Sequence, residues 1–314
     1  MSTSTLRSVA GVDSLHLRYK HVFLEDIIDF CNRHGYKFEV KVRNTDKIYK
    51  RVVHIYLPDG KPVRSTYHPP TKTTKFEIGG LFDYSKEMNE IHLFLQRLVS
   101  EFSESELEVS RLDVAVDARH PLMFKKVNND KNVHLYNDTT LYINKGKIQF
   151  VVYDKSRQLQ LYSINHLTRY ELRLEKLKDW HVSNFLDSKN SLVKLIEKVE
   201  KLFWEEYVQY FEKYSLVSAY DLEFNFRKLF YDFIEFIHGG GLPPFKDHHK
   251  VVKAIENRDR FFNWMREHGL KDIAAVKRHI KGKKRVACRE IDVSDKTLGN
   301  IIRTYEGIPN FKVR

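Results

Sequence analysis

The chain has 314 residues, of which 42% are hydrophobic and 31% charged, and its formal net charge is +12 at pH 7. This hydrophobic content, with 21 Phe and 17 Tyr, excludes a disordered chain, while the charged content and a mean hydropathy of -0.51 predict a soluble protein. Residues 1–20 contain no apolar core of a signal peptide, so we expect a cytoplasmic protein with no membrane partner. Two cysteines, Cys31 and Cys288, argue against disulfides or a cysteine zinc site.

The positive charge indicates a polyanionic partner, because clustered Lys and Arg gain affinity by releasing counterions from phosphates. Its distribution is uneven. Residues 246–314 contain 18 Lys and Arg against 9 Asp and Glu, which is a net +9 of the total +12. The C-terminal fifth is therefore the predicted site of nucleic-acid binding.

The first part of the chain is predicted to be β-rich with two helices. Apolar residues at helical spacing predict helices over 24–34, which ends before Gly35, and over 84–102. Alternating or β-branched runs separated by turn residues predict strands over 38–42, 52–57, 63–67 and 75–78.

The second part repeats this organisation. Strands are predicted over 107–117, 140–143, 147–153 and 168–175, and Asn144-Lys145-Gly146 is typical of a hairpin turn. Long helices are predicted over 191–214 and 222–237. We therefore predict an α+β protein with antiparallel sheets and flanking helices in a duplicated domain of residues 1–238. A Gly- and Pro-rich linker over 239–246 would separate it from a smaller helical domain of residues 247–314.

The C-terminal pattern is wholly helical, with helices predicted over 250–268, 270–280, 285–289 and 295–305. The last two resemble a helix-turn-helix, with Ser294 as the N-cap of the second helix. A generic basic helical hairpin gives the same pattern. The predicted DNA-contacting side chains are those of Lys281, Lys283, Lys284, Arg285, Lys296 and Arg303.

Two motif absences narrow the chemistry. The sequence contains no GxxxxGK[ST] phosphate-binding loop, which argues against an ATP-driven helicase. No two of its 15 histidines are spaced by two residues, so a local pair of histidine ligands is excluded. Carboxylates are then the favoured ligands for a hard divalent cation.

Two predicted strands supply such carboxylates. Period-two alternation places Arg111, Asp113 and Asp117 on one face of the strand over 107–117. The same alternation places Arg169, Glu171 and Arg173 on one face of the strand over 168–175. Asp113 and Glu171 could share one Mg²⁺ or Mn²⁺ if the strands pair. A solvated face of Arg and Glu pairs gives the same alternation, and the pattern alone does not decide between them.

Three blocks of sequence carry a resemblance to a known family. They are Arg111-Leu112-Asp113-Val114-Ala115-Val116-Asp117, Tyr153-Asp154-Lys155-Ser156-Arg157-Gln158 and Thr168-Arg169-Tyr170-Glu171-Leu172-Arg173-Leu174. In this order they resemble the blocks of the replication initiation factor family, which comprises rolling-circle initiators of small plasmids and filamentous phages and some conjugative relaxases. The similarity spans about residues 38–214, and Thr168 stands where the family often has an aromatic residue.

The resemblance implies a sequence-specific endonuclease that nicks one DNA strand at an origin and forms a 5'-phosphotyrosyl intermediate, on a duplicated nickase-like sheet. It implies Asp113, Glu171 and Asp117 as metal site residues and Lys155 near the scissile phosphate. Arg111, Arg169 and Arg173 would contact DNA. Single- and double-stranded origin DNA and a host helicase are the expected partners, and a homodimer is left open.

The nucleophile is the least determined residue. Family members carry it on a helix after the strand with the glutamate, which here points to Tyr207 and Tyr210. Aromatic core packing of that helix explains the same residues. Tyr153, Tyr162 and Tyr170 are alternatives by proximity to the acidic strands. A non-catalytic origin- or RNA-binding protein and a conjugative relaxase with the same chemistry are the competing functions.

Overall fold

The computed structural model describes residues 6–45, 48–84, 88–126, 130–161, 166–240, 249–282, 287 and 290–306. The strands are β1 Leu6–Lys20, β2 Lys37–Thr45, β3 Ile48–Tyr56, β4 Pro62–His68, β5 Thr73–Gly79, β6 Leu107–Arg119, β7 Val133–Tyr136, β8 Thr140–Lys145, β9 Ile148–Asp154, β10 Leu167–Glu175 and β11 Leu222–Glu223. The α-helices are α1 Leu24–His34, α2 Glu90–Glu101, α3 Lys155–Gln158, α4 Lys189–Lys213, α5 Phe226–Ile237, α6 His249–Glu267, α7 Ile273–Gly282 and α9 Asp295–Glu306. Short 3₁₀ turns lie at Pro69–Thr71 and Leu177–Trp180.

One antiparallel sheet organises the molecule, in the order β2-β3-β4-β5-β1-β6-β10-β9-β8-β7. The two halves have the same order when each is counted from its outer edge: β2-β3-β4-β5-β1 in one half corresponds to β7-β8-β9-β10-β6 in the other. In each half a long first strand pairs with the last strand of a four-stranded meander, and a helix follows that meander. β1 and β6 then pair with each other at the centre. The expected duplicated α+β architecture is therefore present, as a single continuous sheet.

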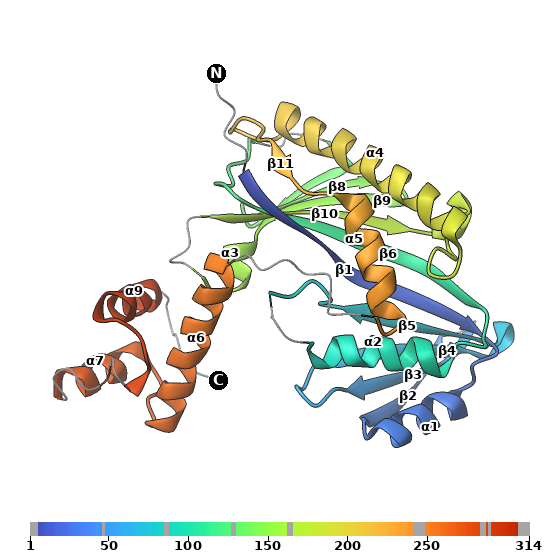
Figure 1. The fold of residues 1–314 in the computed structure, drawn as a ribbon, viewed down its shortest axis with the longest axis horizontal. Coiled ribbons are helices and arrows are strands. Elements are labelled where there is room, and N and C mark those ends of the chain that lie inside the picture. Colours follow the sequence, from blue (N-terminus) through green and yellow to red (C-terminus); the bar gives the residue numbers. More distant parts are fainter. Residues whose placement is uncertain are drawn as a thin grey trace.

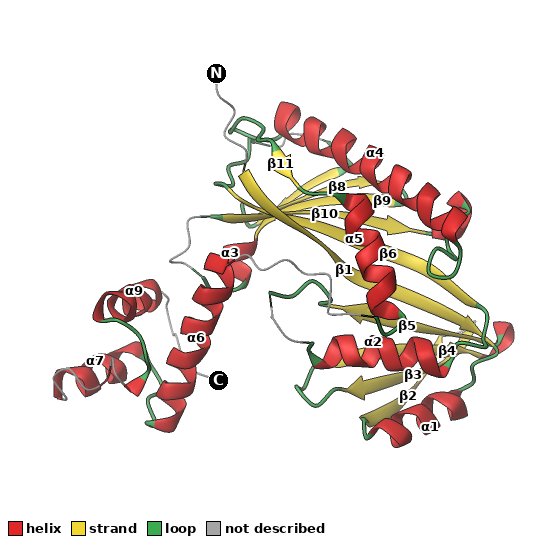
Figure 2. Cartoon of the chain, in the orientation of Figure 1, coloured by secondary structure: helices red, strands yellow, loops and turns green. Residues whose placement is uncertain are grey.

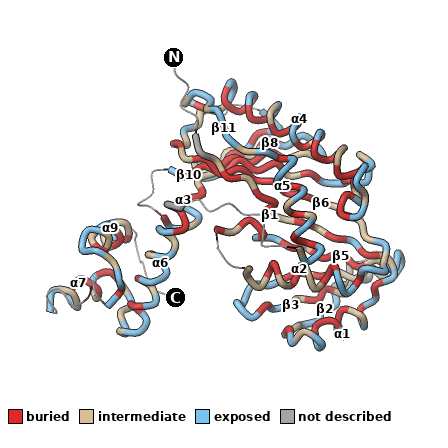
Figure 3. The backbone as a smooth tube through the Cα atoms, in the orientation of Figure 1, coloured by how far each residue is buried: buried red, intermediate tan, exposed pale blue. Residues whose placement is uncertain are grey.

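Helices cover one face of this sheet (Figure 1, Figure 2). Alternate residues of the central strands point into that layer, where they pack with apolar residues of α1, α2, α4 and α5 in one core. Figure 3 shows the central strands as buried along much of their length. The opposite face carries the polar residues of the same strands. Strand alternation thus separates a hydrophobic side from a side available for chemistry.

Capping residues set several helix ends. Gly35, at φ 71°, ends α1 where the sequence predicts its end. Asn89 accepts a hydrogen bond from the His92 amide, so α2 begins at Glu90 rather than at Tyr84. The helix predicted over 222–237 also begins later than expected, at Phe226. Asn225 caps α5, and Leu222–Glu223 instead forms β11 beside β1.

The sequence analysis did not identify β1, which is the longest strand described. Its pairing with β6 is interrupted between Val12 and Ser14, so Asp13 is an extra residue in the ladder. A Cβ built on Gly11 would lie 2.6 Å from the ring of Phe82. Glycine is therefore needed here because the chain after β5 crosses the polar face of β1 at van der Waals distance.

Residues 249–306 form a C-terminal helical unit with a core of its own, which includes Phe261, Trp264, Val276 and Leu298. Ser294 caps α9 as predicted, accepting from the Thr297 amide at 3.2 Å. The first helix of the predicted helix-turn-helix falls largely outside the described residues, so this motif stays a prediction. None of the helices that the structure describes is long and apolar enough to span a bilayer.

The start of α6 contacts the sheet beside α3 (Figure 1). Val251 and Val252 pack with Tyr84, Leu161 and Leu167. Hydrogen bonds add to this contact, since Arg258 donates to the Leu159 carbonyl at 2.6 Å and Tyr305 donates to that of Gln160 at 3.0 Å. The basic unit is thereby held next to the polar face of the sheet.

Candidate active site

The polar face brings together the charged residues of three adjacent strands. In the ladder between β6 and β10, Glu171 lies opposite Ala115 and Arg173 lies opposite Asp113. The side chains of Glu171 and Arg173 therefore lie on the same face of the sheet as that of Asp113. β1 adds Asp13 from its irregularity. The predicted orientation of both acidic strands is confirmed by this register, because Leu112, Val114, Tyr170 and Leu172 all lie in the opposite, helix-covered core.

At one end of this face lies a buried cluster around Arg169. Its guanidinium donates to both oxygens of Asp117, at 2.6 and 2.8 Å, and to Asp13 at 2.6 Å. The Tyr84 hydroxyl also donates to Asp117, and the ring of Phe82 lies 4.5 Å from the guanidinium carbon. Arg169 and Asp117 are both 0% exposed. These two residues, expected at DNA and at the metal, are placed by the structure in a sealed ion pair.

Beside this cluster, Asp113 and Glu171 each accept from an arginine. Arg111 donates to the two Asp113 oxygens at 2.8 and 2.7 Å. Arg173 donates to Glu171 at 2.6 Å, and the same nitrogen lies 4.0 Å from Asp113. One guanidinium therefore lies between the two carboxylates. Both arginines are about a quarter exposed, so they remain open to solvent, unlike Arg169.

Burial is the main influence on the pKa of two carboxyl groups at this site. Burial raises the pKa of Asp113 to about 6, against the lowering effect of Arg111, and the charge of Glu171 adds to the rise. Burial also raises the pKa of Asp13, with Arg169 opposing it. The carboxyl groups of Asp113 and Asp13 are therefore harder to ionise than exposed ones.

Lys155 and Tyr153 border the carboxylates on the β9 side. Lys155 is 8% exposed, donates to Gln158 at 2.7 Å and lies 5.8 Å from the centre of the Tyr153 ring. Burial lowers the pKa of Lys155 to about 8, with the positive charge of Arg169 as the next cause. Burial raises the pKa of Tyr153.

A cavity of about 330 Å³ opens at this position. Tyr153 and Arg173 line it together with Thr140, Tyr142, Arg157 and Gln158. The cavity therefore brings two phenols, those of Tyr142 and Tyr153, and two guanidiniums, those of Arg157 and Arg173, onto one accessible surface.

Tyr207 and Tyr210 are not brought to the carboxylates. Both lie on α4, on the helix-covered side of the sheet, where Tyr207 is 3% and Tyr210 0% exposed. Their rings lie 5.0 and 5.8 Å from that of Tyr170, which points away from Glu171. The Tyr207 hydroxyl donates to the Tyr220 carbonyl at 2.8 Å. The sheet itself separates these two phenols from the acidic face. Tyr170 lies on their side, and Tyr162 lies outside the described residues.

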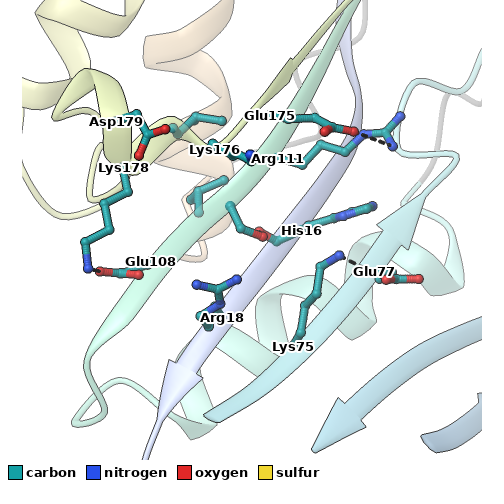
Figure 4. Close-up of a pocket in the computed structure, with 13 residues that line it drawn as sticks. His16, Arg18, Lys75, Glu77, Glu108, Arg111, Glu175, Lys176, Lys178 and Asp179 are labelled. Atoms are coloured by element: carbon teal, nitrogen blue, oxygen red, sulfur yellow. Dashed lines mark hydrogen bonds and ion pairs between the residues drawn. The ribbon is translucent and has the colours of Figure 1, made fainter. Parts of the chain in front are cut away.

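A second hollow of about 510 Å³ lies along the same face, at the far ends of β1 and β6 (Figure 4). Arg111 borders both this hollow and Asp113. The other cations that line this hollow include Arg18, Lys75, Lys176 and Lys178. Lys75 contacts Glu77 at 3.0 Å, and Lys178 contacts Glu108 at 3.5 Å. The polar face thus offers basic side chains on both sides of the acidic residues.

The predicted DNA-contacting residues of the C-terminal unit are placed in part. Lys281 at the end of α7 and Lys296 and Arg303 on α9 are exposed. Lys283, Lys284 and Arg285 lie outside the described residues.

The sequence analysis did not identify Asp13 or Tyr84 as site residues, and it named Tyr153 only as an alternative nucleophile. Asp13 had a detectable signal, because Leu15, Leu17 and Tyr19 alternate with polar residues and indicate a strand. The contact of Tyr84 with Asp117 had none, since it depends on a loop crossing the sheet.

Comparisons with known proteins add little. No family model matches the chain, and no curated protein matches it. Among solved structures, it is similar to a rolling circle replication initiator protein from Geobacillus stearothermophilus. The TM-score is 0.35 and the identity 18%, covering 74% of this chain and 97% of that chain.

Proposed function

We propose that the protein is a metal-dependent DNA nickase acting as a rolling-circle replication initiator. One observation carries the proposal. Asp113 and Glu171, from adjacent central strands, lie nearly buried on the polar face with Lys155 and Tyr153, beside a cavity lined by Tyr153, Arg157 and Arg173. Hard acidic ligands, a phenol and phosphate-binding cations are the groups that phosphodiester transfer to a tyrosine requires.

The donor set fits a hard divalent cation. The Arg173 nitrogen lies 2.6 Å from Glu171 and 4.0 Å from Asp113, so a positive charge is already held between these two carboxylates. Mg²⁺ or Mn²⁺ would compete for this position, with Asp113 and Glu171 as its protein ligands. When bound, the ion neutralises negative charge that develops on the phosphate. Asp117 supports the site indirectly, through its ion pair with Arg169.

Tyr153 is the phenol that we propose as nucleophile, in place of Tyr207 and Tyr210. It lines the cavity, whereas the other two lie across the sheet. Its oxygen would bond to phosphorus while the bond to the 3'-oxygen breaks, and the phenol proton passes to solvent. Lys155, with a pKa of about 8, can donate a proton to the leaving 3'-oxygen. The phosphotyrosine conserves the bond energy for later rejoining.

The test is a trapping experiment that requires no knowledge of the origin. The full chain is incubated with Mn²⁺ and single-stranded DNA of random sequence, and covalent protein–DNA adducts are isolated under denaturing conditions. We expect an adduct that mass spectrometry locates on Tyr153. It should be lost in Asp113→Asn, Glu171→Gln and Tyr153→Phe, and retained in Tyr207→Phe and Tyr210→Phe.

Glu175→Gln is the matched control, because Glu175 follows Glu171 on the same face of β10 but is exposed. Sequencing the trapped DNA would then give the preferred nicking site. An adduct on Tyr207 or Tyr210 would reject the assignment of Tyr153 while keeping the nickase. The origin role, a host helicase partner and a homodimer are further parts of the same proposal. A conjugative relaxase would use the same site.

A specific observation favours a second candidate, a non-catalytic nucleic-acid-binding protein. Arg111 and Arg173 already pair with Asp113 and Glu171, as expected of a face that only grips a phosphate backbone. Binding of single-stranded DNA that is independent of Mn²⁺, with no adduct at any metal concentration, would establish this reading.

A further inference from the structure

The C-terminal helical unit contains a second group of ligand-type side chains, far along the chain from the acidic face. One ring nitrogen each of His268 and His279 and one carboxylate oxygen of Glu290 lie within 4.8 Å of one another. They come from three places: His268 directly follows α6, His279 lies in the last turn of α7, and Glu290 lies a few residues before α9. We infer that His268, His279 and Glu290 bind a transition-metal cation, with Zn²⁺ as the ion that their chemistry fits best.

The hydrogen bonds of His268 fix which nitrogen is available. Its Nδ1 lies 2.9 Å from the carbonyl oxygen of Trp264, which can only accept, so Nδ1 carries the proton. In the neutral ring the Nε2 lone pair is then free to act as a ligand, and Nε2 lies 3.3 Å from a Glu290 oxygen. A backbone carbonyl that orients the distal nitrogen of a histidine is the usual support of a metal ligand.

His279 supplies an independent observation. Its Nε2 is buried and has no hydrogen-bond partner among the described residues. A buried polar atom without a partner is costly, and metal coordination is one way to satisfy it. Its ring lies 5.2 Å from that of His268 and 5.4 Å from that of Trp264.

Glu290 is also positioned by its surroundings. The Trp264 indole donates to it at 3.0 Å, and Trp264 is 2% exposed. The carboxylate is therefore held at the edge of the unit's core, facing the two imidazoles.

Distances and ligand types select the metal. Zinc binds imidazole nitrogen and carboxylate oxygen at about 2.0–2.2 Å, which in a tetrahedral site separates the ligand atoms by roughly 3.4 Å. The 3.3 Å between His268 and Glu290 already matches this spacing. All three ligand atoms lie within 4.8 Å of one another, so the remaining pairs would approach by at most about 1.4 Å to reach this spacing. Mg²⁺ prefers oxygen ligands, so two imidazoles argue against it. Three protein ligands leave a fourth position for water.

This site would join the end of α6, α7 and the segment before α9 through one ion. It would stiffen the basic unit without touching the acidic face. The inference rests on the helical unit alone and is independent of the proposed nickase activity.

The test measures zinc on the full chain. We expect the purified protein, dialysed against Zn²⁺ and then metal-free buffer, to retain one zinc per chain by elemental analysis. His268→Gln, His279→Gln and Glu290→Gln should each weaken binding by more than the about 10- to 100-fold typical of losing a supporting contact. Glu290→Gln keeps an oxygen acceptor for Trp264, so its fold is expected to survive. His134→Gln, at an exposed histidine of β7, and Glu267→Gln, at the exposed neighbour of His268, should retain zinc.

Two further readouts separate ligand loss from misfolding. Co²⁺ should give the visible absorption of a four-coordinate site and quench Trp264 fluorescence, and the quenching should be absent in Trp264→Phe. Asp113→Asn and Glu171→Gln should keep the zinc, because they belong to the other site. Zinc retained by folded His268→Gln and His279→Gln, or absent from the folded wild-type chain, would overturn the inference.

Discussion

Arg169 and Asp117 form a two-bond ion pair that is completely removed from solvent between β6 and β10. A single substitution that leaves one buried charge without its partner costs about 3–5 kcal/mol. We therefore expect Arg169→Met to lower the free energy of unfolding by that amount, measured by urea denaturation. A direct role of Arg169 in binding DNA would instead reduce affinity with little loss of stability.

The matched control is the double variant Arg169→Met with Asp117→Leu. Replacing both charges by apolar groups removes the unpaired Asp117 carboxylate and leaves only Asp13 without its arginine, so stability should recover in part. A double variant less stable than the sum of the single ones would contradict a pair isolated from solvent.

His120 should make the protein sensitive to mild acid. It is 3% exposed, accepts a hydrogen bond from the Tyr170 hydroxyl, and burial lowers its pKa to about 4. Between the unfolded pKa of about 6.5 and this value, the unfolded chain binds the proton and the folded chain does not. Stability is thus complete above about pH 6.5 and falls as the pH drops toward 4, by about 3 kcal/mol for this group.

Chemical denaturation at a series of pH values checks this expectation. His120→Gln should be less stable at neutral pH but show a flatter acid profile. His134→Gln, which changes an exposed histidine of β7, should retain the wild-type profile. An unchanged acid slope in His120→Gln would assign the effect to other groups.

Gly11→Val should disturb the chain that crosses the polar face. The new Cβ would lie 2.6 Å from the Phe82 ring, and overpacking of this kind costs about 1–3 kcal/mol. Thermal unfolding measures the loss. Adding Phe82→Ala should relieve the clash, so the two changes together should cost less than their sum. Additive costs would show that Phe82 does not lie over Gly11.

Salt dependence should distinguish the two basic surfaces. Lys176→Ala with Lys178→Ala removes two cations of the hollow beside Arg111 and should lower the salt slope of single-strand binding by about 1.4, at about 0.7 per phosphate. Lys283→Ala with Lys284→Ala should instead lower the slope of duplex binding by about two. Fluorescence anisotropy at several salt concentrations gives both slopes. If each double variant lowered the salt slope equally for single-stranded and duplex DNA, the two basic surfaces would not differ in the DNA that they bind.

The predictable parts of the fold are those with a local signal. Gly35 ends α1 and Ser294 starts α9 because capping depends on a few adjacent residues. The carboxylate face was also predictable, since alternation fixes the side of Asp113 and Glu171 once each strand is known. Their pairing with Arg111 and Arg173 within the strand follows the same alternation, which the sequence shows without deciding between a metal site and an ion-pair network.

The remaining parts depend on contacts distant in sequence. Asp13 reaches Arg169 only because β1 is irregular where it pairs with β6, and no local pattern specifies that register. The position of Tyr207 follows from the side on which α4 packs. That side was implied by the inward direction of Tyr170 and Leu172, because an amphipathic helix covers the apolar face of a sheet. Combining the two strands with that helix excludes Tyr207 from the carboxylate side.

Because the two halves of the sheet have equivalent strand orders, the chain could be divided between β1 and β6. Each five-stranded half ends at the strand through which it meets the other, so either half expressed alone would present a long unpaired β edge. Two copies of one half could satisfy that edge by joining β1 to β1 about a twofold axis. Such a pair would rebuild a continuous ten-stranded sheet from two identical five-stranded chains.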